Sequence, residues 1–180
     1  MMKLVLLTTL FLTTTLASTP VFAQEDANNQ IRFICSTSRY SENGKSVPTT
    51  FLWTPNFQKA MVTWTSVLGG VTPQERCQKV SQNFQTAFNN GSLNYVTNAF
   101  QNGNKVICSV SSIDGDGGCD TVLFTLRPQD KSQNVLRHLN KLWFGSATTG
   151  PIPQSSGEDK FKFYIDIRQF LNTPPANKMQ

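Results

Sequence analysis

The sequence predicts an α+β fold: an antiparallel sheet of about five to seven strands with two main helices and two disulfides. Short segments of alternating polarity, separated by Gly, Asn and Pro, are typical of antiparallel strands. Two longer segments have apolar residues at helical spacing. The strands occur in runs, and this order favours α+β over a regularly alternating α/β sheet.

Residues 1–23 have the pattern of a secretory signal peptide. Lys3 is followed by a largely apolar run, and Val21-Phe22-Ala23 fits the small-residue rule for cleavage. The run is too short and too rich in threonine to span a bilayer. We expect cleavage after Ala23, a flexible segment over residues 24–30, one α+β domain over residues 31–171 and a flexible tail over residues 172–180.

The charge of the chain is mildly basic. The formal charge is +5, and loss of Lys3 with the signal peptide lowers it to +4. The Lys and Arg residues are scattered, which favours a role in solubility over binding to nucleic acid. Because no second apolar stretch approaches about 20 residues, we expect no transmembrane helix after cleavage.

The first half of the mature chain contains three predicted strands. Residues 31–35 alternate, residues 49–54 are rich in Thr and aromatic residues, and residues 60–66 alternate again before Gly69-Gly70. Turn signals such as Asn43-Gly44 separate them.

A helix is predicted to begin after Thr72. Thr72 suits the N-cap, Pro73 the first helical position, and Glu75 completes a capping box. A core-facing stripe follows, and Gly91 provides a left-handed stop. The stripe consists of Cys77, Val80, Phe84, Ala87 and Phe88.

Three further strands, residues 93–97, 105–110 and 119–126, are separated by glycine-containing turns and predict a meander. A second helix is predicted over residues 132–144. Its apolar side would carry Val135, Leu136, Leu139, Leu142 and Trp143, with Arg137, Asn140 and Lys141 opposite. Residues 161–168 alternate most cleanly and predict a strand, followed by a short helical turn over residues 169–172.

The four cysteines, Cys35, Cys77, Cys108 and Cys119, predict two disulfides with three possible connectivities. We prefer Cys35–Cys77, which would tie the first strand to the helix, and Cys108–Cys119, which would close a hairpin. A zinc site is disfavoured because such sites need closely spaced ligand pairs.

No catalytic motif stands out in the sequence. His138 is the only histidine, and no partner that would orient it as a base is identifiable. Asp114, Asp116 and Asp120 are spaced on a flexible loop as Ca²⁺ ligands could be, but Thr125 stands where an EF-hand needs a glutamate. The sequence therefore predicts no catalytic residues and no cofactor, with these three aspartates as a weak calcium candidate.

Several short segments, in order, resemble the cyanobacterial circadian oscillating polypeptide domain family. They include Thr72-Pro73-Gln74-x-Arg76-Cys77-Gln78, Gly91-Ser92-Leu93-Asn94-Tyr95-Val96-Thr97, Val106-Ile107-Cys108 and Tyr164-Ile165-Asp166-Ile167. The resemblance covers about residues 31–171 and includes the four cysteines. It implies an exported cyanobacterial protein, peripheral to a membrane or soluble, and transfers no catalytic residue or cofactor.

Two functions are consistent with the sequence. The leading hypothesis is an exported, non-enzymatic binding or accessory protein of the periplasm, cell envelope or thylakoid lumen, whose partner is an envelope protein, a glycan or a membrane surface. The alternative is a small hydrolase that uses paired carboxylates, drawn from Asp114, Asp116, Asp120 and Asp166, on an envelope glycan or peptide.

Overall fold

The structure, a computed structural model, describes residues 30–39, 44–114, 118–145 and 162–173. The predicted signal peptide lies outside these ranges. The described residues form, in order, β1 (Arg32–Ser38), β2 (Val47–Trp53), β3 (Gln58–Thr63), α1 (Pro73–Asn89), β4 (Tyr95–Gln101), β5 (Asn104–Val110), β6 (Thr121–Thr125), α2 (Ser132–Phe144), β7 (Ile165–Asp166) and α3 (Arg168–Asn172).

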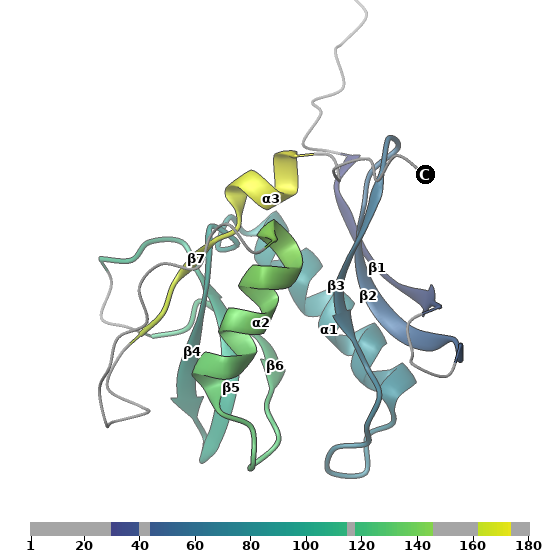
Figure 1. Ribbon diagram of the computed structural model, residues 1–180. Helices are drawn as coiled ribbons and strands as arrows, with labels where there is room; N and C mark the ends of the chain where they lie inside the picture. Colours follow the sequence, from purple (N-terminus) through teal and green to yellow (C-terminus); the bar gives the residue numbers. More distant parts are fainter. Residues whose placement is uncertain (1–29, 40–43, 115–117, 146–161, 174–180) are drawn as a thin grey trace, which may run out of the picture.

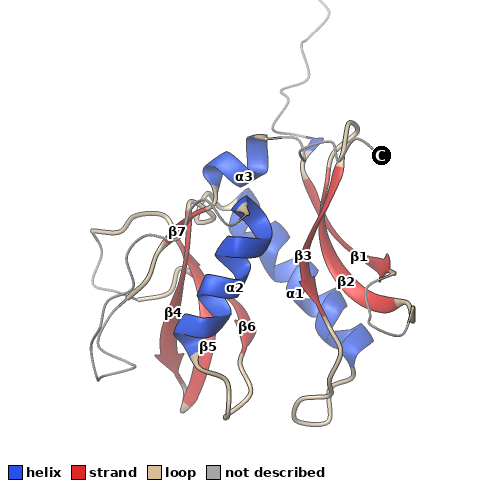
Figure 2. Ribbon diagram, viewed as in Figure 1, coloured by secondary structure: helices blue, strands red, loops and turns tan. Residues whose placement is uncertain are grey.

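The strands form two antiparallel sheets, β1-β2-β3 and β6-β5-β4-β7 (Figures 1 and 2). The predicted α+β class, strand number and two disulfides are confirmed. The division into two sheets was not visible in the sequence. Alternation shows which residues face a core, but it does not show which strands pair.

The helix α1 connects the two sheets. It packs against β1 and β2 on one side and against β6 on the other. Its side chains also hydrogen-bond to both sheets: Gln85 Oε1 accepts from the Phe33 N–H at 2.9 Å, and Asn83 Nδ2 donates to the Leu123 carbonyl at 2.9 Å. The helix therefore serves as a shared wall of one core.

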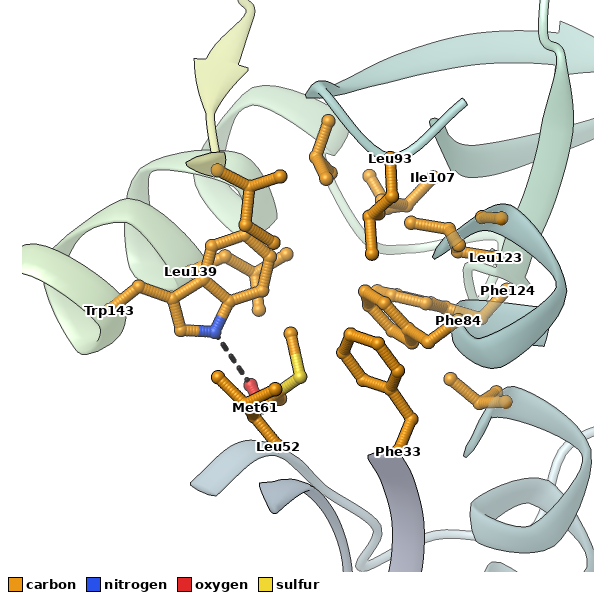
Figure 3. Packing of buried hydrophobic residues seen from close by; sticks show 14 of the residues in the cluster. Phe33, Leu52, Met61, Phe84, Leu93, Ile107, Leu123, Phe124, Leu139 and Trp143 are labelled. Atoms are coloured by element: carbon orange, nitrogen blue, oxygen red, sulfur yellow. Dashed lines mark hydrogen bonds between the residues drawn. The ribbon is translucent and has the colours of Figure 1, made fainter. Parts of the chain in front are cut away.

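The core lies between the sheets and contains residues from both (Figure 3). Phe84 of α1 is fully buried, and its ring stacks on that of Phe33 with centroids 5.5 Å apart. From the other side, α2 contributes Trp143, whose indole Nε1 donates to the Met61 carbonyl at 3.2 Å. Because both sheets bury their apolar faces in this cluster, neither sheet has a separate core.

The predicted strand over residues 161–168 was too long. Only Ile165 and Asp166 pair with β4, and residues 162–164 form no strand. Here a side-chain hydrogen bond takes the place of a backbone bond between strands: Thr97 Oγ1 donates to the Phe163 carbonyl at 2.9 Å. The chain continues as α3 from Arg168. Phe170 of this helix packs against Trp143, with ring centroids 5.5 Å apart, and this contact stabilises α3. The helical turn predicted at 169–172 is confirmed.

The buried face of α2 also differs from the prediction. Asn140 is 7% exposed, whereas Leu142 is 46% exposed. The buried residues Leu136, Leu139, Asn140 and Trp143 follow one helical stripe, and this stripe turns toward β3 as well as β4 and β5. Contact with both sheets rotates the buried face by about one residue and places Leu142 outside it.

No helix in the described ranges is long and apolar enough to cross a bilayer.

Candidate functional site

The start of α1 follows the prediction closely. Thr72 Oγ1 accepts from the Glu75 N–H at 3.3 Å, and Glu75 Oε2 accepts from the Thr72 N–H at 2.8 Å, so the capping box is present. The hydrogen bonds from Thr72 lower the pKa of Glu75. Pro73 occupies the first turn. This well-defined start holds Cys77 at a fixed place in the core, where it is fully buried.

Both disulfides in the structure have the preferred pairing. Cys35 of β1 is joined to Cys77 of α1, with Cα atoms 5.5 Å apart, and Cys108 of β5 is joined to Cys119, with Cα atoms 5.6 Å apart. The first closes a separation of 42 residues and the second a separation of 11. They fasten the first sheet to the helix and the loop after β5 to its own strand.

Arg76, next to Cys77, has a structural role. Its guanidinium lies over the Trp64 ring, 4.6 Å from the centroid. It donates to the Ser66 carbonyl at 3.2 Å and to the Thr125 carbonyl at 3.4 Å, and burial lowers its pKa. These contacts join the loop after β3 to β6, so Arg76 links the two halves of the fold.

The predicted calcium ligands are only partly described. Asp120 Oδ2 accepts from the Ser111 N–H at 2.7 Å and from Ser111 Oγ at 2.8 Å. Asp114 is exposed, and its own N–H donates to Ser112 Oγ at 3.1 Å. Asp116 lies outside the described residues. Among the residues that are described, no group of three His, Cys, Asp or Glu side chains could hold a metal ion.

The remaining acid of interest, Asp166, is bound by a neighbour. Its two carboxylate oxygens accept from Arg168 Nε at 2.9 Å and from Arg168 Nη2 at 2.6 Å. The hydrogen bonds from Arg168 lower the pKa of Asp166. Arg168 also lies over the Tyr95 ring, 4.9 Å from its centroid. Asp166 and Asp120 therefore belong to two separate local groups, and neither lines the cavity described next.

A cavity of about 490 Å³ lies beside the second half of β4. Residues 98–101 of β4 line it consecutively, together with Lys105 of β5, Ser132 at the start of α2, residues 118–119 and Lys162. Consecutive residues line it because β7 pairs only with residues 95–96 and no described strand continues along that edge. Small-molecule sites commonly measure about 300–1,000 Å³, so the volume suits a small ligand or part of a chain.

Asn98 is the most unusual residue of this cavity. It is 8% exposed, and its Oδ1 atom is buried without a hydrogen-bond partner in the part of the chain that the structure describes. It lies opposite Ile107 in the ladder, where Ile107 is fully buried. An unsatisfied buried carbonyl lowers the stability of the fold by about 1–3 kcal/mol. A hydrogen-bond donor supplied by a ligand would remove this cost.

Two lysines give the cavity positive charge. Lys105 is half-buried, and its Nζ donates to the Asp130 carbonyl at 3.2 Å, while Lys162 is exposed. The Asp130 carboxylate is occupied by Arg127, with Nη2 to Oδ1 at 2.8 Å. No acidic side chain is among the described residues that line the cavity, so the charged groups of its described lining are all cationic.

This site was not predicted from the sequence. One signal was available: Asn98 occupies an inward position of a strand, two residues after the buried Val96. A polar residue at a core position indicates either a hydrogen-bond network or a binding function. Nothing in the sequence indicated that Lys105, Ser132 and Lys162 lie together, because they are far apart along the chain.

These features define a class of protein: a disulfide-linked α+β domain of two antiparallel sheets around one core. The chain belongs to the circadian oscillating protein COP23 family, whose sequence model matches residues 32–172. The family predicted from the sequence is thereby confirmed. Comparison with the curated proteins and with the solved structures found no match.

Proposed function

We propose that this protein is an exported, disulfide-linked binding or accessory protein of the cell envelope or thylakoid lumen, without catalytic activity. The observation that carries the proposal is the cavity beside β4, which offers two lysines, an unsatisfied amide oxygen and an exposed aromatic ring. The described lining residues provide binding groups, and no carboxylate or imidazole that could act as a general base is among them.

Export is supported by the cysteines. Two disulfides, with no free cysteine among the described residues, suit an oxidising compartment. The signal-peptide pattern of residues 1–23 points the same way. Fractionation of cells with a salt wash of the membranes tests this proposal. Protein in the soluble exported fraction or in the salt eluate supports it, and protein confined to the cytosol would contradict it.

A hydrolase would need two carboxylates facing each other across a cleft. Asp166 is occupied by Arg168 and its pKa is lowered, which makes it unsuited to protonate a leaving group near neutral pH. Asp120 is held by Ser111. Because both carboxylates already accept hydrogen bonds from neighbouring residues, we favour binding over hydrolysis.

The test is an activity screen of the full chain, expressed with export so that the disulfides form. We expect no release of product from glycan or peptide panels, and equal behaviour of Asp120→Asn and Asp166→Asn. Turnover that disappears in either variant would overturn the non-enzymatic proposal.

A further inference from the structure

The cavity beside β4 combines three kinds of recognition group, and it deepens the proposed binding function. From their combination we infer that the cavity binds an acidic saccharide: a sugar that carries a carboxylate or sulfate group together with free hydroxyls. The inference rests on the proposed function, because it names the ligand class of the same site.

The first group is the unsatisfied oxygen of Asn98. As a carbonyl oxygen it can only accept, so its complement in a ligand is a donor. An anion alone has no hydrogen to donate. A sugar hydroxyl supplies one. Because Oδ1 is itself buried, the Asn98 amide must turn toward the cavity to accept this bond, and the bond would remove the cost of the unpaired atom.

The second group is the pair of lysines. Lys105 and Lys162 approach the cavity from different segments, and no acidic side chain among the described lining residues opposes them. Lys105 uses one of its N–H groups on the Asp130 carbonyl, which fixes its ammonium in place and leaves two for a ligand. Ser132, the first residue of the 13-residue helix α2, adds the positive end of that helix at the same wall. This positive wall matches the acidic group of the ligand.

The third group is Phe100. It lines the cavity and is 73% exposed, more than any other large apolar residue among those that the structure describes. Phe100 lies opposite Lys105 in the ladder, so the aromatic ring and the ammonium stem from neighbouring positions. An aromatic face packs against the C–H face of a sugar ring by the hydrophobic effect. A neutral sugar would leave the lysines unmatched, and a simple anion would leave Phe100 and Asn98 unmatched.

An acidic peptide is the other ligand that could satisfy part of this lining, because on the edge of β4 away from β5 no described strand pairs beyond Val96. A peptide bound as an added strand would use the backbone of residues 98–101 and would not need the ring of Phe100. The effect of removing this ring therefore separates the two.

The experiment measures binding of the full exported chain by isothermal titration to four probes: tetramannuronate, the neutral maltotetraose, tetraglutamate peptide and inorganic sulfate. We expect tetramannuronate to bind and to weaken as sodium chloride rises from about 20 to 200 mM. The other three should bind at least about tenfold more weakly, since each lacks one or more of the matched groups.

Three variants assign the binding to this cavity. Lys162→Glu should weaken tetramannuronate at least about tenfold, since an attraction becomes a repulsion. Phe100→Ala and Asn98→Leu should each weaken it about threefold to tenfold. The matched control is Lys79→Glu, which makes the same charge change on the exposed face of α1 and should leave affinity unchanged. Thermal unfolding identifies variants that lose the fold, and the exposed positions 100 and 162 keep the test valid if Asn98→Leu is unstable.

The outcomes separate this inference from the proposed function. Absence of tetramannuronate binding, or binding indifferent to Lys162→Glu and Phe100→Ala, overturns the acidic-saccharide site. Preferential binding of tetraglutamate also overturns it but leaves a non-enzymatic binding protein in place. Cleavage of a probe would instead contradict the proposed function.

Discussion

Trp143 donates its indole N–H to the Met61 carbonyl at 3.2 Å, and this bond joins α2 to β3 of the opposite sheet. Both residues are buried, at 7% and 0% exposure. The Trp143 ring also stacks on Phe170 of α3. One side chain thus connects three elements that are remote in the sequence, and it shows how the two sheets share a core.

Replacement of this tryptophan by phenylalanine tests the bond itself. Trp143→Phe keeps an aromatic ring but leaves the Met61 carbonyl without this donor, and we expect a loss of about 1–2 kcal/mol in the free energy of unfolding. Trp143→Ala should cost about 3–5 kcal/mol because it also creates a cavity. Urea denaturation measures both. Equal losses for the two variants would show that ring packing contributes nothing beyond the hydrogen bond.

We predict that even a conservative replacement of Arg76 destabilises the fold. Arg76→Lys keeps the charge, but an ammonium cannot stack flat on Trp64 while reaching the Ser66 and Thr125 carbonyls. We expect a loss of about 1–2 kcal/mol by urea denaturation. The control is Arg32→Lys on the exposed side of β1, where no loss is expected. Similar values for the two variants would contradict the linking role of Arg76.

The two disulfides should differ in their contributions. In the loop-entropy model, the Cys35–Cys77 bond over 42 residues contributes about 4 kcal/mol and the Cys108–Cys119 bond over 11 residues about 3 kcal/mol. Paired Cys-to-Ala variants of each bridge, compared by denaturation, test this order. Peptide mapping of the unreduced protein tests the pairing, and a Cys35–Cys108 peptide would refute it.

Acid should weaken the fold partly through Asp130. The hydrogen bonds from Arg127 lower the pKa of Asp130 in the folded state, with a smaller contribution from Arg76. A lowered folded-state pKa stabilises the protein above the ordinary value of about 3.9, and this stabilisation is lost as the pH falls through the lowered value. Because the Arg127 side chain is 43% exposed, screening limits the effect to about 0.5–1 kcal/mol.

The corresponding measurement compares wild type with Asp130→Asn at pH 7 and at about pH 2.5. The variant should be less stable at pH 7 and nearly equal to wild type in acid. A deficit that persists unchanged at low pH would mean that Asp130 acts through packing and not through its charge.

Calcium is predicted to have no effect on stability. Asp120 already accepts two hydrogen bonds from Ser111. With one oxygen from each aspartate, this loop supplies about three of the roughly 6–8 oxygen ligands that Ca²⁺ prefers. The melting temperature should be the same with 1 mM Ca²⁺ and with a chelator. A site saturated at about 100 times its dissociation constant would add about 2.7 kcal/mol, and a corresponding rise in melting temperature would revive the Asp114, Asp116 and Asp120 site.

Local patterns predicted the elements well where the decisive contacts are local. The cap at Thr72 and Glu75 lies within four residues, and the stripe of α1 follows from helical spacing alone. The strand predicted at 161–168 was too long because alternation carries no information about the pairing partner. Thr97 Oγ1 donates a hydrogen bond to the Phe163 carbonyl, and these two residues are 66 positions apart in the sequence.

By itself the sequence determined the α+β class, the family, the start of α1 and the expectation of two disulfides, because these follow from spacing and composition along the chain. Export and the signal peptide stay predictions. Only the tertiary structure decided the division into two sheets, the rotation of α2 that buries Asn140, and the cavity at Asn98. Each of these depends on which distant segments meet. The cavity lies where β7 no longer pairs with β4, and Lys105 of β5 and Lys162 are among its lining residues.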